Sequence, residues 1–131
     1  MYNSLAKTKK AREAPRAEMK NERNIKMSVK HLNSENFKEI ISKGTALVDF
    51  YADWCGPCRM LAPVIEDIAN ERPELTVAKV NVDGAPELAR EFGIVSIPTV
   101  IIFKGGEPAK RITGVRPKAQ LLSLIDEAAG V

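Results

Sequence analysis

Short apolar runs alternate with amphipathic segments along most of this chain of 131 residues, and that alternation limits the fold more than any other feature. Residues 46–51 and 99–103 are apolar on both faces, which is typical of central strands that are covered on both sides. Residues 37–41 and 61–69 place apolar side chains at the i, i+3, i+4 spacing of one helix face. The order of these segments predicts an α/β fold, with helices packed on both faces of a central mixed sheet.

Turn and cap residues set the boundaries of the remaining elements. Asn33 and Ser34 are candidate N-caps for the first helix, and Gly44 is suited to the position after its end. Residues 104–107, with two central glycines, are typical of a hairpin turn. The predicted helices are at 37–41, 57–72, 86–92 and 121–128, and the predicted strands are near 28–32 and at 46–51, 75–82, 99–103 and 109–113.

One domain is expected for a chain of this length, and the composition excludes two classes of protein. No apolar run approaches the roughly 18 residues that a spanning helix needs, so a membrane protein is excluded. Two cysteines cannot staple a small disulfide-rich secreted fold. The net charge of +3 divides into +6 over residues 1–30 and −3 over residues 31–131. The folded part is therefore mildly acidic, and we expect no nucleic-acid partner.

A basic N-terminal extension, residues 1–26, precedes a domain that we expect at residues 27–131. The extension is rich in Lys, Arg, Ala and Glu but has no apolar stripe, which favours an arm or a solvated helix. It lacks the apolar segment of a secretory signal. Arg12 and Arg16 suggest an organelle presequence, whereas three glutamates argue against one, and a non-native leader ahead of Met27 is a further alternative. We expect a cytoplasmic location unless the extension is a presequence.

The two cysteines, Cys55 and Cys58, lie where an expected central strand gives way to a helix. Residues three apart on a helix have Cβ atoms about 5–6 Å apart, and a disulfide needs about 3.5–4.5 Å, so a small adjustment opens or closes the bond. Pro57 is suited to the first helical turn, which places Cys55 at the helix N-terminus, where a thiolate is favoured. We therefore expect Cys55 to be the nucleophile and Cys58 to be the less exposed, resolving thiol.

A structural or metal-binding role is the alternative for these cysteines. A closed zinc site needs four ligands, and the chain supplies one histidine, His31, far away in the sequence, with no second cysteine pair. A disulfide that closes so short a loop contributes little to the stability of the fold, which argues against a purely structural role. We therefore expect no metal, and a redox couple in its place.

Asp49 interrupts an apolar strand six residues before Cys55. Burial raises the pKa of a carboxyl group, which would suit Asp49 to proton transfer near neutral pH. A carboxyl group that only accepts structural hydrogen bonds, or that faces solvent, is the alternative. Lys79 interrupts another apolar strand and would pair with Asp49 if the two strands adjoin, which the sequence leaves open.

Three motifs occur in order along the chain. Residues 48–58 read Val-Asp-Phe-Tyr-Ala-Asp-Trp-Cys-Gly-Pro-Cys, residues 79–83 read Lys-Val-Asn-Val-Asp, and residues 93–99 read Gly-Ile-Val-Ser-Ile-Pro-Thr. In these motifs the chain resembles the thioredoxin family closely, and the resemblance covers about residues 28–131. Tyr51 is a departure, because many members carry a second tryptophan at this position.

The resemblance implies a thioredoxin fold and a role for each motif residue. Cys55 would attack a substrate disulfide, Cys58 would resolve the mixed disulfide, and Asp49 would aid proton transfer. A cis peptide bond would precede Pro98, and the backbone of Ile97 would bind the substrate chain. The residues implied in substrate contact or in tuning the redox couple are Trp54, Gly56, Pro57, Pro98 and Gly114.

The implied function is the reduction of protein disulfides through a reversible Cys55–Cys58 disulfide, with no bound cofactor. The chain has no nucleotide-binding glycine fingerprint, so a separate thioredoxin reductase would supply the electrons. Disulfide-containing proteins would be the substrates, and we expect a monomer. The alternative functions are an oxidant or isomerase on the same fold, and a binding subunit with idle cysteines.

Overall fold

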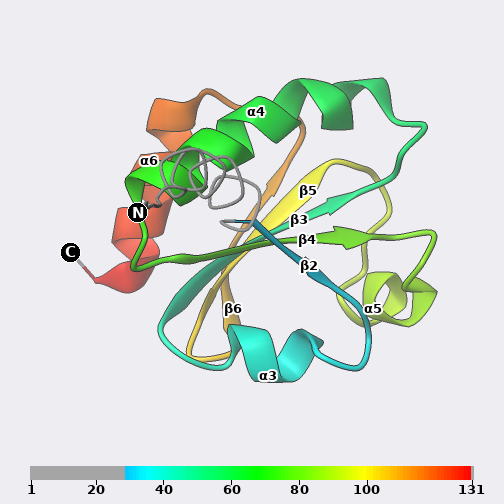
Figure 1. The fold of residues 1–131 in the computed structure, drawn as a ribbon, viewed down its shortest axis with the longest axis horizontal. Coiled ribbons are helices and arrows are strands. Elements are labelled where there is room, and N and C mark those ends of the chain that lie inside the picture. Colours follow the sequence, from blue (N-terminus) through cyan, green and yellow to red (C-terminus); the bar gives the residue numbers. More distant parts are fainter. Residues whose placement is uncertain (1–28, 131) are drawn as a thin grey trace, which may run out of the picture.

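A five-stranded sheet lies between two layers of helices in the computed structural model, which describes residues 29–130 (Figure 1). The elements are β2 (Val29–Leu32), α3 (Phe37–Ile41), β3 (Thr45–Tyr51), α4 (Gly56–Glu71), β4 (Thr76–Asn81), α5 (Pro86–Glu91), β5 (Thr99–Lys104), β6 (Glu107–Thr113) and α6 (Lys118–Ala129). The strands lie in the order β2-β4-β3-β5-β6. β4 is parallel to β2 and β3, whereas β5 is antiparallel to β3 and β6, which confirms the predicted mixed sheet.

Each face of the sheet carries its own hydrophobic cluster. On one face, α4 and α6 pack against side chains of β3, β4 and β5, Leu47 among them. On the other face, α3 and α5 pack against the intervening side chains, such as Val48 and Phe50. Side chains alternate along a strand, so Asp49 lies on the same face as Leu47, the face that α4 covers. The fold therefore brings the aspartate and the cysteine-bearing helix to one side of the sheet.

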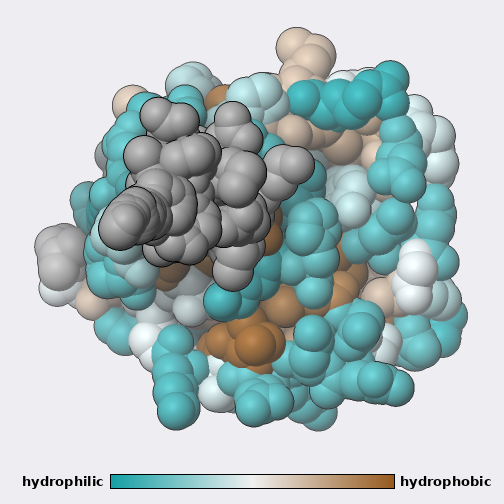
Figure 2. All heavy atoms as spheres, in the orientation of Figure 1, coloured by the Kyte–Doolittle hydropathy of each residue, from teal (hydrophilic) through white to brown (hydrophobic). Residues whose placement is uncertain are grey.

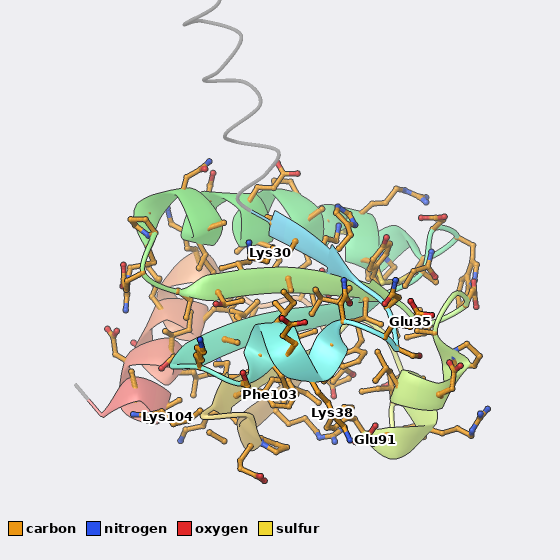
Figure 3. The ribbon with its side chains drawn as sticks, turned by 60° about the horizontal axis from the view of Figure 1, so that its bottom comes forward. Lys30, Glu35, Lys38, Glu91, Phe103 and Lys104 are labelled. Atoms are coloured by element: carbon orange, nitrogen blue, oxygen red, sulfur yellow. A yellow bond between two sulfur atoms is a disulfide. The ribbon has the colours of Figure 1, made fainter. Side chains whose placement is uncertain are left out.

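The phenylalanines meet on the opposite face, beneath α3 and α5. The ring of Phe37 on α3 lies 5.7 Å from that of Phe103 on β5, centroid to centroid, and Phe92 contacts both rings. Figure 3 shows Phe103 beside α3, and Figure 2 shows hydrophobic atoms gathered near α3 on a face that is otherwise mostly hydrophilic. Such aromatic pairs contribute about 0.5–1.5 kcal/mol each beyond the burial of their area, and so they hold α3 against the sheet.

The predicted cap of α3 is wrong. The Asn33 side chain accepts hydrogen bonds from the backbone N–H groups of Glu35 (2.9 Å) and Asn36 (3.1 Å), which closes the turn before the helix. Asn36 occupies the N-cap position, without a hydrogen bond from its side chain to the helix. Ser34 donates instead to Glu87 on α5, at 3.0 Å. The Asn33 side chain therefore stabilises the turn that precedes α3 and does not cap the helix itself.

The hairpin is confirmed, but β6 begins at Glu107 rather than at residue 109. Gly105 and Gly106 both have positive φ (58° and 86°), which confines the turn to two residues and lets the strand start at once. α4 is the longest described helix, with 16 residues. Within residues 29–130, no helix is both long and apolar enough to cross a membrane.

Candidate active site at the start of α4

Cys55 lies at the N-cap position of α4, as the sequence predicts. Its backbone is extended (φ −91°, ψ 114°), and its Sγ accepts a hydrogen bond from the backbone N–H of Cys58 at 3.2 Å. Pro57 lies in the first turn, where its missing N–H group costs no helical hydrogen bond. A backbone N–H group and the positive end of the helix dipole therefore point at Cys55, and both favour negative charge on its sulfur.

Cys55 and Cys58 are joined by a disulfide bond, with their Cα atoms 5.3 Å apart. The two residues are almost equally buried, at 4% and 3% exposure. Cys58 is the less exposed of the two, as predicted, but in this oxidised form the difference is only one percentage point. The sequence also predicted correctly the pairing itself, at the junction of a central strand and a helix.

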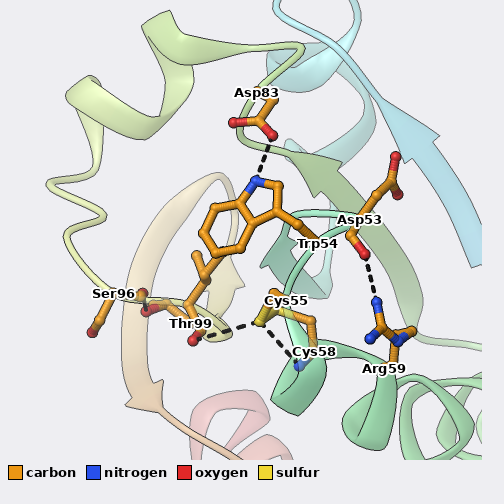
Figure 4. The surroundings of a disulfide bond; sticks show 9 residues. Asp53, Trp54, Cys55, Cys58, Arg59, Asp83, Ser96 and Thr99 are labelled. Atoms are coloured by element: carbon orange, nitrogen blue, oxygen red, sulfur yellow. Dashed lines mark hydrogen bonds between the residues drawn. A yellow bond between two sulfur atoms is a disulfide. The ribbon is translucent and has the colours of Figure 1, made fainter.

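The aromatic ring of Trp54 lies beside the disulfide (Figure 4). Its side chain is 69% exposed, which excludes a role in core packing. The indole N–H donates to a carboxylate oxygen of Asp83 at 2.9 Å, so the ring is fixed in place although it faces solvent. An exposed, oriented aromatic side chain next to a reactive disulfide is suited to contact with another protein.

The chain that precedes β5 lies opposite the disulfide. The Ile97–Pro98 peptide bond is cis, as the family resemblance implied. The carbonyl oxygen of Ile97 lies 3.9 Å from the Cys55 Sγ. Gly114, with φ of 95°, donates its backbone N–H to the Pro98 carbonyl at 2.8 Å, which ties the loop after β6 to this segment. The structure therefore brings Ile97, Pro98 and Gly114 together next to the cysteines.

Asp49 is completely buried, and neither of its carboxylate oxygens has a hydrogen-bond partner. Burial raises the pKa of Asp49 from 3.8 to about 6, and the charge of Lys79 opposes that rise without cancelling it. The carboxyl group can therefore change its protonation state near neutral pH. This excludes the alternatives in which Asp49 faces solvent or accepts structural hydrogen bonds.

Lys79 is the register partner of Asp49, because β3 and β4 are neighbours in the sheet. Its ammonium group nevertheless lies over the ring of Tyr51, with Nζ 4.4 Å from the ring centroid, and it donates no hydrogen bond to Asp49. The two groups interact through their charges rather than as a contact ion pair. A pocket of about 160 Å³ opens to solvent beside Lys79 and is lined by Tyr51, Ala52, Asp53, Cys58, Arg59, Ala62 and Lys79. Sequence reasoning missed the contact with Tyr51.

No three His, Cys, Asp or Glu side chains within residues 29–130 lie close enough together to hold a metal ion. His31 is exposed on β2, where it is the register partner of Lys79. The histidine is thus on β2, whereas the two cysteines are at the start of α4.

Comparison with known proteins identifies the family. The sequence model described as Thioredoxin matches residues 28–127. The chain belongs to the thioredoxin family. Its Cys-Gly-Pro-Cys pair occupies the family's active-site position, and its class of chemistry is thiol–disulfide exchange.

Individual thioredoxins match most of the chain. This chain is 46% identical over 101 residues to a thioredoxin of Chlamydia pneumoniae, and the match covers 77% of this chain and 99% of that protein. It is 51% identical over 106 residues to a bifunctional thioredoxin reductase/thioredoxin of Mycobacterium leprae, a match that covers 79% of this chain but 23% of that protein. Among solved structures, an N21Q mutant thioredoxin from Halobacterium salinarum NRC-1 superposes with a TM-score of 0.73 at 35% identity, covering 78% of this chain and 91% of the other.

Proposed function

We propose that this thiol–disulfide oxidoreductase works as a reductase of protein disulfides. The observation that carries the proposal is the Cys55–Cys58 disulfide at the N-terminus of α4, with the Cys55 Sγ 3.9 Å from the carbonyl oxygen of Ile97. A helix N-terminus favours the thiolate form of the reduced pair, and the thiolate is the attacking species in disulfide exchange. The reduced protein would therefore begin the reaction poised to attack.

Cys55 is the nucleophile in this proposal. Its thiolate forms a bond to one sulfur of the substrate disulfide, and the other substrate sulfur leaves as a thiolate. Cys58 then attacks the Cys55 sulfur, which releases the second substrate thiolate and restores the disulfide within α4. The substrate gains two electrons and two protons, and the cysteine pair loses them.

Asp49 takes the proton from the Cys58 thiol during the second step. Its pKa of about 6 supports this role, since a base works best when its pKa is close to the working pH. Asp49 and α4 lie on the same face of the sheet, and the pocket beside Cys58 and Lys79 gives water a route to this buried region. Lys79 would tune the carboxyl group through its charge.

The substrate chain lies against the segment before β5 and pairs with the backbone of Ile97 in an extended conformation. Cys55 then faces the substrate disulfide, because its sulfur lies 3.9 Å from the Ile97 carbonyl oxygen. The surrounding contact surface consists of Trp54, Gly56, Pro57, Pro98 and Gly114. Gly56 and Pro57, which separate the two cysteines, also influence the redox potential of the pair.

Electrons return to the cysteine pair from a separate thioredoxin reductase. The relative from Mycobacterium leprae supports this choice, since its name joins a thioredoxin reductase to a thioredoxin in one chain. A reductase-linked cycle suits the reducing conditions of the cytoplasm, and disulfide-bearing proteins there would be the substrates. We propose that residues 27–131 act as a monomeric domain and that residues 1–26 are not needed for the chemistry.

The test is reduction of a model protein disulfide by the full chain, supplied with NADPH and a flavoprotein thioredoxin reductase, together with the redox midpoint of the Cys55–Cys58 pair. We expect catalytic reduction that a Cys55→Ser substitution abolishes. A strongly oxidising midpoint would assign the oxidant function instead. Full biological activity in a variant that lacks both cysteines would assign a binding role.

A further inference from the structure

A groove of about 340 Å³ lies between Trp54, α5 and the segment that precedes β5. Its walls are mostly apolar, and it is lined by Trp54, Val82, Pro86, Ala89, Arg90, Ile94, Val95, Ser96 and Ile97. Val95 is 96% exposed and Trp54 is 69% exposed, so the groove is framed by the two most exposed of the large hydrophobic side chains. Exposed apolar side chains gathered in this way are typical of a surface that contacts another protein.

The groove continues the site of thiol chemistry. Ile97 lines its near end, and the carbonyl oxygen of the same residue lies 3.9 Å from the Cys55 Sγ. Figure 4 shows Trp54 between the disulfide and Asp83, with the loop that carries Ser96 to one side. A substrate segment that pairs with the Ile97 backbone would therefore place a neighbouring side chain into the groove.

Among residues 29–130, Arg90 is the one charged side chain that lines the groove. It is exposed, and it forms no ion pair with any carboxylate of residues 29–130. The acidic residues beside Arg90 on α5 form no contact ion pair with it. Glu87 accepts a hydrogen bond from Ser34 at 3.0 Å, and the charge of Arg90 also acts on this carboxylate. Glu91 lines a separate hollow with Lys38, and the two residues are labelled near each other in Figure 3. The exposed guanidinium group can therefore meet a further carboxylate supplied by a partner.

The opposite end of the groove carries the opposite charge. Asp83 accepts the hydrogen bond from the Trp54 indole at 2.9 Å, and so a carboxylate lies at the Trp54 side while a guanidinium lies at the α5 side. A substrate carboxylate is attracted toward one end and repelled from the other, which fixes the direction in which a segment binds.

We infer that Arg90 selects substrate segments in which an apolar residue next to the reactive cysteine is followed by an acidic residue. This inference rests on the proposed function and adds a substrate class to it. The apolar side chain fills the groove between Trp54 and Val95, and the carboxylate meets Arg90. An ion pair at such an exposed position is worth up to about fivefold in rate.

The experiment uses single-turnover reduction of disulfide-linked peptides by the pre-reduced full chain, with the products quantified after an acid quench. One peptide carries Leu-Glu beside the reactive cysteine and the other carries Leu-Gln, and each is made with the pair on either side of the cysteine. In one of the two arrangements we expect the Leu-Glu peptide to have a second-order rate constant up to about fivefold higher. Near 1 M salt, where charges act over only about 3 Å, the preference should disappear.

Substitutions at Arg90 locate the effect. Arg90→Glu should reverse the preference and Arg90→Lys should keep most of it, because the charge decides. Lys43→Glu is the matched control, since Lys43 is exposed in the turn before β3 and the substitution changes the net charge by the same amount. Equal rates for the two peptides in both arrangements, or an equal loss of preference in Lys43→Glu, would overturn the inference. A chain that reduces no peptide, including one with only Gly and Ser around its disulfide, would overturn the proposed function itself.

Discussion

Replacing Asp49 by asparagine should make the oxidised protein more stable at alkaline pH and change it little in acid. Asp49 is completely buried without a hydrogen-bond partner, and burial raises its pKa from 3.8 to about 6. Between these two pH values the folded state keeps a proton that the unfolded state has released. Stability therefore falls as the pH rises through this window, by 1.36 kcal/mol for each pH unit, or about 3 kcal/mol in total. Asparagine does not ionise, so the variant escapes this loss.

The assay is urea unfolding of the oxidised wild type and of Asp49→Asn at pH 4 and at pH 8. Other titrating groups affect both proteins alike, so the difference between the two isolates Asp49. We expect the stability of the variant relative to wild type to improve by roughly 2 kcal/mol between pH 4 and pH 8, because the carboxyl group of the unfolded state is already partly ionised at pH 4. A relative stability that does not change with pH would refute the argument, because it would mean that the carboxyl group ionises at an ordinary pH in the folded protein.

Three further predictions concern the roles in the cycle. Lys79→Met removes the positive charge that opposes the rise, so the pKa of Asp49 should move above 6, which a ¹³C NMR titration of the carboxyl group measures; an unchanged midpoint would exclude Lys79 as its partner. Cys58→Ser should accumulate mixed disulfides with substrate proteins whereas Cys55→Ser should not, as judged by non-reducing electrophoresis; equal trapping by both would contradict the order of attack. Deletion of residues 1–26 should leave the rate of disulfide reduction within about twofold of the full chain, and a tenfold loss would give the extension a function.

The sequence predicted those parts of the site that depend on local structure. Pro57 and the change from an apolar strand to a helical pattern placed Cys55 at the N-terminus of a helix, and the structure confirms this. The apolar neighbours of Asp49 along its strand predicted a buried carboxyl group, which is also confirmed. In both cases the deciding information lies within a few residues along the chain.

The remaining features depend on pairing between distant segments, and the sequence left them open or gave them wrongly. The proximity of Asp49 and Lys79 requires β3 and β4 to be neighbours, which the strand order settles. The position of the Lys79 ammonium over the Tyr51 ring depends on the conformation of a flexible side chain, which the sequence does not specify. The groove at Arg90 joins Trp54 to residues 82–97, which are well separated from it in sequence, so no local pattern marks it.

The central claim is that the Cys55 thiol ionises readily at the start of α4 and attacks first. The direct measurement is the rate of alkylation of each cysteine in the reduced protein as a function of pH, followed by mass spectrometry of the modified peptides. The account predicts that Cys55 reacts well before Cys58 and that its rate reaches half its maximum at a pH clearly below about 8.5, the value for a free thiol. Half-maximal reactivity of Cys55 at or above that pH, or equal reactivity of the two cysteines, would contradict it.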